Sequence, residues 1–384
     1  MSALAIAAFT PAHSPCGSRI STEEGKVYEE GQTDIEKSLS QFDFTQLEDF
    51  ISENLKESNI GFYDLVSRLI TQKEMLSAQE IVKKMFQMLL RQVEKNRLQG
   101  IQILMLVVCS SVLSSIAAVF ESEQISQQAW FVIFLMVIAC ALTGFLQSCS
   151  MVTSCLRSAI SFMKLLIPAF CLSMVCITGA SASGIYYQAT FGIVALVETA
   201  LLYGILPIVK LYFGVSALNG LTGGERFSGI EELLKVIYDW SMKTLCAIVV
   251  GMQVIQGLIV PLASGTRAAF AQKLLGALPG IGNGIKSTAE IIVGTAALIK
   301  NGIGMAGCIF LVMAGIYPIL QMAAIVLIYY GVGAIVSPVA DKRMSAAIKA
   351  VSYTNRMLLK ALCLSVFLFF VTIAVICAFT NRVA

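Results

Sequence analysis

Three ionisable side chains stand inside otherwise apolar runs of the sequence. They are Glu198 in VALVETALL, Glu290 in STAEIIVG and Lys300 in ALIKNGIG. A charge at the centre of a bilayer costs roughly 2.5–3.5 kcal/mol on insertion scales, so we expect each of them to face protein or water rather than lipid. A polar contact between helices is the simplest interpretation, and a polar lining for a pathway or a partner-docking groove is the functional alternative. A proton relay has less support, because the only histidine is His13, in the N-terminal tail.

The sequence offers no catalytic constellation. A single histidine excludes His-based metal sites and the Ser-His or Cys-His pairs of hydrolases. The 11 cysteines form no CxxC pair and lie mostly in or beside apolar segments, as small hydrophobic residues do. Residues 302–307, GIGMAG, match the letters of the dinucleotide motif GxGxxG, but their flanks predict apolar helix and no βαβ unit. We therefore expect no enzyme activity, no cofactor and no metal ion.

Glycine is dense between residues 276 and 307, and four of these glycines are candidate packing residues: Gly280, Gly284, Gly302 and Gly304. Glycine allows two helices to approach closely. It also allows non-helical turns, which occur at membrane depth only where protein or water covers them. The segment 274–307 is therefore interpreted as a broken or re-entrant hairpin, or as part of one extra span.

The elements that position these residues follow from composition. Of the 384 residues, 57% are hydrophobic and only 13% are charged, with a mean hydropathy of +0.79. A soluble domain is typically about a quarter charged. Such a chain cannot hide its apolar surface from water in an ordinary domain, which indicates an all-α, polytopic membrane protein in the lipid bilayer. The formal net charge is only +3, so no nucleic-acid partner is expected.

About 20 apolar residues cross the hydrocarbon layer as a helix, and this length predicts about seven spans, within a range of about six to eight. The expected spans are residues 100–120, 129–147, 165–184, 190–212, 244–264, 302–330 and 358–379. Together they make a transmembrane domain over residues 99–384. Residues 21–98 predict short amphipathic helices in a water-compatible region, and residues 1–20 resemble a truncated signal peptide.

Lysine and arginine gather before alternate spans. They occur within residues 83–97, 157–164, 210–243 and 342–360, whereas the connections 121–128 and 181–188 have none. Cytoplasmic loops of membrane proteins carry the excess of positive charge, which places residues 80–98 and 340–360 in the cytoplasm. A cleaved signal peptide would instead place residues 21–98 outside, so the side of that region stays open.

Three stretches resemble the stage III sporulation protein AE family of endospore-forming Firmicutes. They are LPGIGNGIKSTAEIIVGTAALIKNGIGMAGCIFLVMAGIYPIL at 278–320, SALNGLTGGERFSGI at 216–230 and VADKRMSAAI at 339–348. The resemblance covers about residues 40–384 and implies a polytopic component of the mother-cell apparatus. With a forespore partner, that apparatus forms a channel-like complex, related to specialised secretion systems, across the double membrane during engulfment.

The same resemblance implies partners and a location. The partners would be other stage III sporulation membrane proteins and a separate sporulation ATPase, and the location would be the mother-cell membrane around the forespore. The family brings no catalytic residues to this sequence. The leading hypothesis is thus a membrane scaffold or channel-platform subunit. The alternative is an ion- or solute-coupled transporter permease, whose ion site would lie at the Gly/Pro-broken segments near Glu290.

Overall fold

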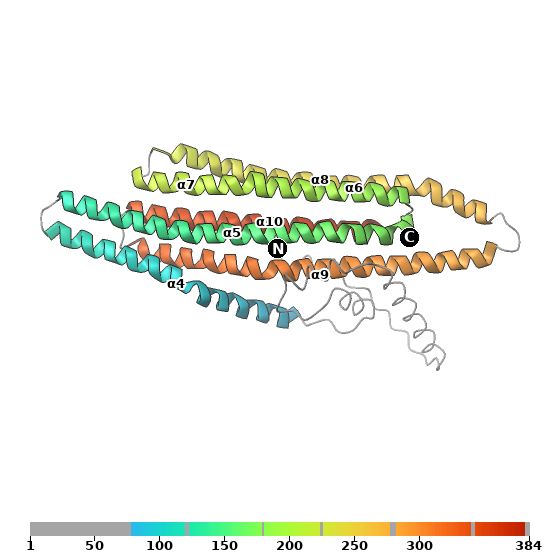
Figure 1. Ribbon diagram of the computed structural model, residues 1–384, viewed down its shortest axis with the longest axis horizontal. Helices are drawn as coiled ribbons and strands as arrows, with labels where there is room; N and C mark the ends of the chain where they lie inside the picture. The colour runs from blue at the N-terminus through green and yellow to red at the C-terminus, as the bar shows by residue number, and fades with distance from the viewer. Residues whose placement is uncertain are drawn as a thin grey trace. The chain divides into compact units, whose positions relative to one another are not determined.

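The computed structural model of the protein describes residues 78–119, 123–178, 180–222, 226–276, 282–338 and 342–380. Every regular element within these ranges is a helix (Figure 1). The elements are α4 (Ala78–Val119), α5 (Glu123–Thr178), α6 (Ala180–Thr199), η2 (Ala200–Ile205), α7 (Leu206–Thr222), α8 (Ser228–Gly276), α9 (Gly282–Val336) and α10 (Lys342–Thr380). The prediction of an all-α protein is confirmed. The signal-like segment 1–20 and the amphipathic helices expected before residue 78 lie outside the described residues.

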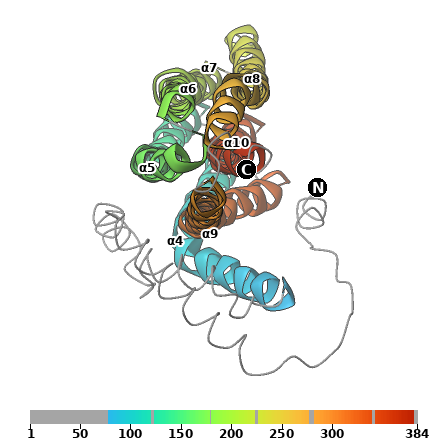
Figure 2. The same cartoon turned by 90° about the vertical axis from the view of Figure 1, so that its right-hand side faces the viewer.

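Helix α10 is the centre of the packing. It contacts α5, α6, η2, α7, α8 and α9, and in the end-on view of Figure 2 it lies between α5, α8 and α9. Helices α4 and α5 both pack on α9, and α6 packs on α5. The π-helical stretch η2 joins α6 to α7 without interruption, because Leu206 after it keeps helical dihedral angles.

Glycines on α9 determine how closely α5 and α10 approach this helix. A Cβ atom at Gly304 would overlap the sulfur of Cys377 on α10 and would lie 3.3 Å from Phe170 on α5. A Cβ atom at Gly307 would lie 2.8 Å from Leu166 on α5. These side chains therefore occupy the space that a larger residue would fill, as small residues allow in membrane helix packing.

Contacts between helices also fix their register along the bundle. Gly220 on α7 borders both Phe134 of α5 and Ala347 of α10, so the N-terminal parts of α5 and α10 are level. Gly315 on α9 faces Val366 of α10. Together with the contacts at Gly304, this places the C-terminal part of α5 level with the C-terminal part of α10.

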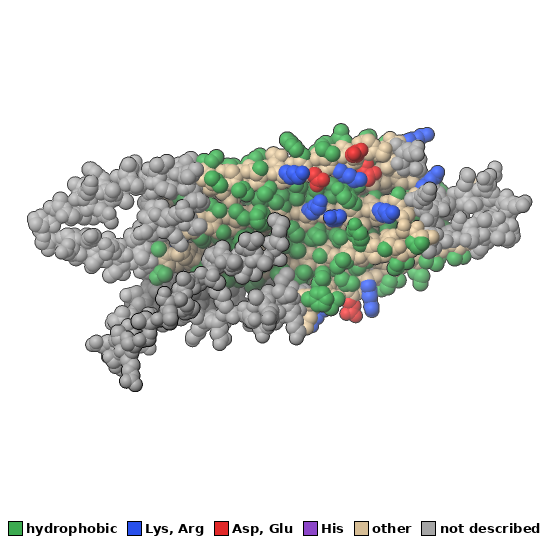
Figure 3. All heavy atoms as spheres, turned by 180° about the vertical axis from the view of Figure 1, so that it is seen from behind, with side chains coloured by type: hydrophobic (Ala, Val, Ile, Leu, Met, Phe, Trp, Pro, Cys, Tyr) green, Lys and Arg blue, Asp and Glu red, His purple; other side chains and the backbone are tan. Residues whose placement is uncertain are grey.

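Charge divides the bundle into two parts along α10. Residues 342–360 of α10 contain five of its basic side chains, at positions 342, 343, 349, 356 and 360, whereas residues 361–380 contain no charged residue. We call the part of the bundle level with 342–360 the basic half and the part level with 361–380 the apolar half. On the face in Figure 3, charged side chains gather over one half of the described surface.

Fewer candidate spans are found within the described residues than the sequence predicted. The described residues contain four helical stretches that are long and apolar enough to cross a membrane: Phe131–Val175, Ser183–Gly220, Ala297–Val336 and Arg343–Cys377. The expected spans 129–147 and 165–184 are largely one continuous helix, α5, because residues 148–164 between them contain polar side chains but no glycine or proline. The expected span 244–264 lies in α8, and part of its side chains lies outside the described residues.

The glycine-rich segment 274–307 contains a helix end. Helix α8 ends at Gly276, and α9 begins at Gly282. Residues 277–281 lie outside the described residues, so a re-entrant turn there stays a prediction. From Gly282 onward the backbone is one helix that continues through Pro318 to Val336. Helix α9 itself is unbroken, and the Gly/Pro segment at 277–281, on which the permease alternative depends, lies outside the described residues, so that alternative stays a prediction.

Candidate functional site

Glu198 forms an ion pair between two helices. The Nζ atom of Lys164 on α5 donates a hydrogen bond to Oε2 of Glu198 on α6, at 2.7 Å. Neighbouring residues of α5 place this pair in the apolar half: the ring of Phe162 lies 4.3 Å from that of Phe310 on α9, and Leu166 touches Gly307. The sequence did not suggest this pairing. Lys164 is 34 residues from Glu198 along the chain and was interpreted as part of the basic flank of an expected span.

The other residues singled out in the sequence lie along α9. Lys300 is buried, and Gly302 and Gly304 beside it are buried as well. The backbone of Gly284 and Glu290 belongs to α9. Gly280 lies outside the described residues, as does the side chain of Glu290, so a role for either in a pathway stays a prediction.

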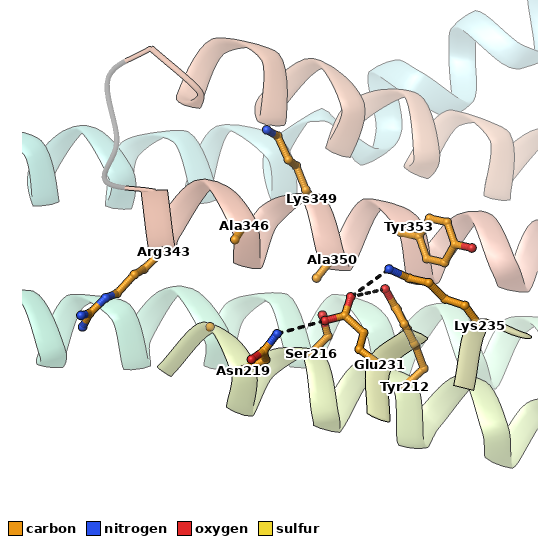
Figure 4. A pocket seen from close by; sticks show the side chains of 11 residues that line it. Tyr212, Ser216, Asn219, Glu231, Lys235, Arg343, Ala346, Lys349, Ala350 and Tyr353 are labelled. Atoms are coloured by element: carbon orange, nitrogen blue, oxygen red, sulfur yellow. Dashed lines mark hydrogen bonds and ion pairs between the residues drawn. The ribbon is translucent and has the colours of Figure 1, made fainter. Parts of the chain in front are cut away.

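A polar pocket of about 410 Å³ opens in the basic half, between α7, α8 and α10 (Figure 4). Eleven residues line it: Tyr212, Ser216, Asn219 and Gly220 from α7, Glu231 and Lys235 from α8, and Arg343, Ala346, Lys349, Ala350 and Tyr353 from α10. Two of the stretches that carried the family resemblance, 216–230 and 339–348, thus meet at this pocket. Both stretches lie between the spans expected from the sequence, whereas the structure makes most of both stretches helical and adjacent.

Glu231 is the hub of the pocket. Tyr212 donates a hydrogen bond from its hydroxyl to Oε1 of Glu231 at 2.7 Å, and Asn219 donates from Nδ2 to Oε2 at 3.2 Å. Lys235, one turn further along α8, lies 3.2 Å from Oε1. Asn219 also accepts a hydrogen bond from the backbone N–H of Phe227. The end of α7 is in this way tied to the first turn of α8.

The electrostatics of the pocket favour the ionised carboxylate. Burial would raise the pKa of Glu231, but the hydrogen bonds from Tyr212 and Lys235 and the charge of Lys235 outweigh it and hold the pKa below its usual value. The ammonium group of Lys235 also lies 5.5 Å from the ring centre of Tyr212 and 5.1 Å from that of Tyr353. Cation–π attraction of this kind adds to the ion pair.

A second pocket adjoins the first. It measures about 400 Å³ and lies between α9 and α10, where Tyr329, Tyr330 and Arg356 are among its lining residues. Lys349 and Tyr353 line both pockets. Figure 4 shows Lys349 extending away from the Glu231 cluster. Both pockets present basic and phenolic side chains, and the only carboxylate among their lining residues, that of Glu231 in the first pocket, already has partners.

This arrangement suits recognition better than bond-breaking chemistry. Its side chains supply hydrogen-bond donors, positive charge and aromatic faces, which are the groups that hold a polar or anionic partner. Across the described ranges, no three His, Cys, Asp or Glu side chains lie close enough to hold a metal ion. Sequence reasoning missed the pocket because Glu231 and Arg343 are far apart along the chain. The one available signal was that the motifs at 216–230 and 339–348 both combine polar residues with apolar neighbours.

Comparisons with known proteins agree with the resemblance of the three stretches. A family model described as stage III sporulation protein AE matches residues 60–380. A curated relative, stage III sporulation protein AE of Bacillus subtilis (strain 168), is 22% identical over 303 residues, which cover 78% of this chain and 75% of the relative. No solved structure matches.

Proposed function

The chain belongs to the stage III sporulation protein AE family, and we propose that it is a membrane-embedded platform subunit of the transport complex that links mother cell and forespore. Its location would be the mother-cell membrane around the forespore. Its partners would be other stage III sporulation membrane proteins and a separate sporulation ATPase. Its contribution is assembly, with no cofactor, metal ion or nucleic acid involved.

One observation carries the assembly role: the exposed apolar surface of α5 is longer than a bilayer is thick. Phe131 is 49% exposed and Leu172 is 61% exposed. At 1.5 Å per residue these two positions are roughly 60 Å apart along the helix. The hydrocarbon core of a bilayer is about 30 Å thick. One membrane therefore cannot cover both ends of this surface.

The distribution of charge indicates which end lies in lipid. Residues 361–380 of α10 have the length and composition of one membrane crossing, so the bilayer surrounds the apolar half. The basic half then faces the cytoplasm by the positive-inside rule. The exposed apolar side chains of α5 in the basic half need a protein to cover them. They are Phe131, Val132, Leu135, Met136, Leu142 and Leu146.

A pair of charge substitutions tests this surface. Val132 and Met136 are 55% and 54% exposed and lie one turn apart on α5. We expect the double variant Val132→Asp, Met136→Asp to reduce co-purification of the other stage III sporulation membrane proteins from sporulating cells about tenfold, as loss of an interface hot spot does. The matched control is Ser150→Asp, at an exposed position of the same helix. Unchanged co-purification of the double variant would exclude this surface as the assembly site.

The permease alternative makes the opposite prediction. It requires solute or ion flux through vesicles that contain the purified chain alone, and loss of that flux in Glu198→Gln or Glu290→Gln. A platform subunit gives no such flux without its partners. Flux by the purified chain that either substitution abolishes would replace the platform by a permease.

A further inference from the structure

A third cavity lies between α5 and α7, outside the Glu231 pocket. Its volume is about 460 Å³. Its lining residues are Leu146, Cys149, Ser150, Thr153, Ser154, Arg157, Ser158 and Ser161 from α5 and Lys210 from α7. The positions on α5 recur every three or four residues, so one face of an otherwise apolar helix is polar. Only Leu146, at one end of this cavity, also belongs to the exposed apolar surface of α5 described above.

The charges of this cavity are all positive. Arg157 and Lys210 are its ionisable side chains apart from the Cys149 thiol, and no carboxylate is among the lining residues. Neither basic side chain forms an ion pair with any residue that the structure describes. Both are exposed, so they are open to a ligand. Two cations beside a row of hydroxyl groups form a site for an anion that accepts several hydrogen bonds.

Position along the bundle narrows the choice of anion. The ring of Phe162 contacts that of Phe310, which lies on α9 between the positions that face Ile373 and Val366 of α10. Arg157 precedes Phe162 by five residues, roughly 7 Å along the helix. This brings Arg157 to within about two helical turns of residue 361, where the uncharged stretch of α10 begins. In the placement proposed above, that level is the boundary between hydrocarbon and cytoplasm, where lipid phosphates lie.

We propose that the groove between α5 and α7 binds a phosphate-bearing anion, with Arg157 and Lys210 contacting the phosphate and the exposed serines donating hydrogen bonds. Ser150, Ser154 and Ser161 are exposed, whereas the hydroxyl of Thr153 is already donated to the Cys149 carbonyl at 2.7 Å. Basic pockets between membrane helices hold lipid head groups in this way. An anionic phospholipid and a soluble phosphate compound both carry the phosphate group that this site would bind. The depth of the site in the membrane, which rests on the proposed function, favours the lipid.

Binding can be measured on the purified full-length chain in a neutral detergent. The first probe is phosphatidylglycerol in mixed micelles, compared with phosphatidylcholine at the same mole fraction, and the second is inorganic phosphate without lipid. We expect phosphatidylglycerol to be retained in native mass spectra and to raise the unfolding temperature more than phosphatidylcholine does. Arg157→Gln and Lys210→Gln should each weaken retention about fivefold, and the double variant more.

The matched control is Lys243→Gln, which removes one positive charge from an exposed position of α8 outside the three pockets and should leave retention unchanged. Stabilisation by inorganic phosphate that the same two substitutions abolish would identify a soluble phosphate ligand of the site. Equal retention in wild type and in the double variant, with no effect of phosphate, would overturn the proposal. If Arg157→Gln, Lys210→Gln loses lipid binding but still co-purifies its partners, the lipid site is independent of the platform role. If the wild-type chain binds lipid but Val132→Asp, Met136→Asp leaves co-purification unchanged, the lipid site stands and the assembly surface is wrong.

Discussion

The basic half and the apolar half of the bundle hold the same helices together by different means. In the basic half, Tyr238 of α8 donates a hydrogen bond to the backbone carbonyl of Met357, and Glu231 collects three polar partners. In the apolar half, α8 and α10 are joined by a hydrogen bond from Gln253 to Thr372, while α9 brings glycines against its neighbours. Helix α10 passes through both halves. The contacts that a residue of α10 makes with its neighbours therefore depend on the half in which that residue lies.

The surroundings of each half determine how much it costs a charged side chain to lose its partner. A side chain in the basic half that loses a partner can turn to water, as Lys235 can with 37% of its side chain exposed. A side chain in the apolar half has lipid or protein around it, and an unpaired charge there is costly. Equivalent substitutions in the two halves should therefore change the stability of the protein by unequal amounts, and this difference can be measured.

The largest effect is expected from Glu198→Gln. This change keeps the shape of the side chain but leaves Lys164 without its carboxylate in the apolar half. We expect a loss of stability of roughly 2.5–3.5 kcal/mol, the cost of a charge in the bilayer. Thermal unfolding in lipid nanodiscs measures it.

The double variant Lys164→Met, Glu198→Gln is the control for that change. It removes both charges and should recover most of the lost stability, because breaking an ion pair costs more than replacing it. If the double variant is no more stable than Glu198→Gln alone, the cost of Glu198→Gln does not come from leaving the charge of Lys164 unpaired.

A second prediction tests the packing of α9. Gly304→Ala would place a methyl group against Cys377 and Phe170. We expect a loss of about 1–3 kcal/mol, as overpacking typically causes. Gly331→Ala, on the same helix, is the matched control because nothing lies within 4 Å of its added Cβ atom. Equal unfolding temperatures for the two variants would show that close approach at Gly304 does not matter.

Sequence reasoning reached the fold class but not the register of the helices. Composition alone excluded a soluble domain, because no fold hides that much apolar surface from water. The span count failed at residues 148–164, where a dip in hydropathy was interpreted as a loop. Hydropathy reports the surroundings of a helix and does not report where its backbone ends, and this stretch has no glycine or proline to end it.

The pockets were missed for a related reason. The polar face of α5 was readable, since Ser150, Ser154, Arg157 and Ser161 follow helical spacing. Its partner Lys210 was not, because only the packing of α7 on α5 brings the two together. Likewise, the pairing of Lys164 with Glu198 depends on the register between α5 and α6, which single-sequence patterns do not contain.

A third prediction makes the same chemical change in the basic half. Glu231→Gln should cost about 1 kcal/mol, the net worth of a hydrogen bond, since the amide keeps an acceptor and Lys235 can turn to water. Glu232→Gln is the matched control, because the neighbouring side chain is exposed and the charge change is identical. If Glu231→Gln destabilises the protein as much as Glu198→Gln, the division into two halves does not hold.

The smallest effect is the pH dependence of this same contribution. The pKa of Glu231 in the folded protein is lower than its usual value. A lowered pKa stabilises the fold above the ordinary glutamate pKa of about 4.3, and that stability is lost as the pH falls through the folded pKa. The difference in unfolding temperature between wild type and Glu231→Gln should therefore be constant near neutral pH and should shrink in acid. Other carboxylates titrate in both proteins, so the difference isolates Glu231. A gap that stays constant into acid would mean that the hydrogen bonds from Tyr212 and Asn219, rather than the charge of Glu231, hold the ends of α7 and α8 together.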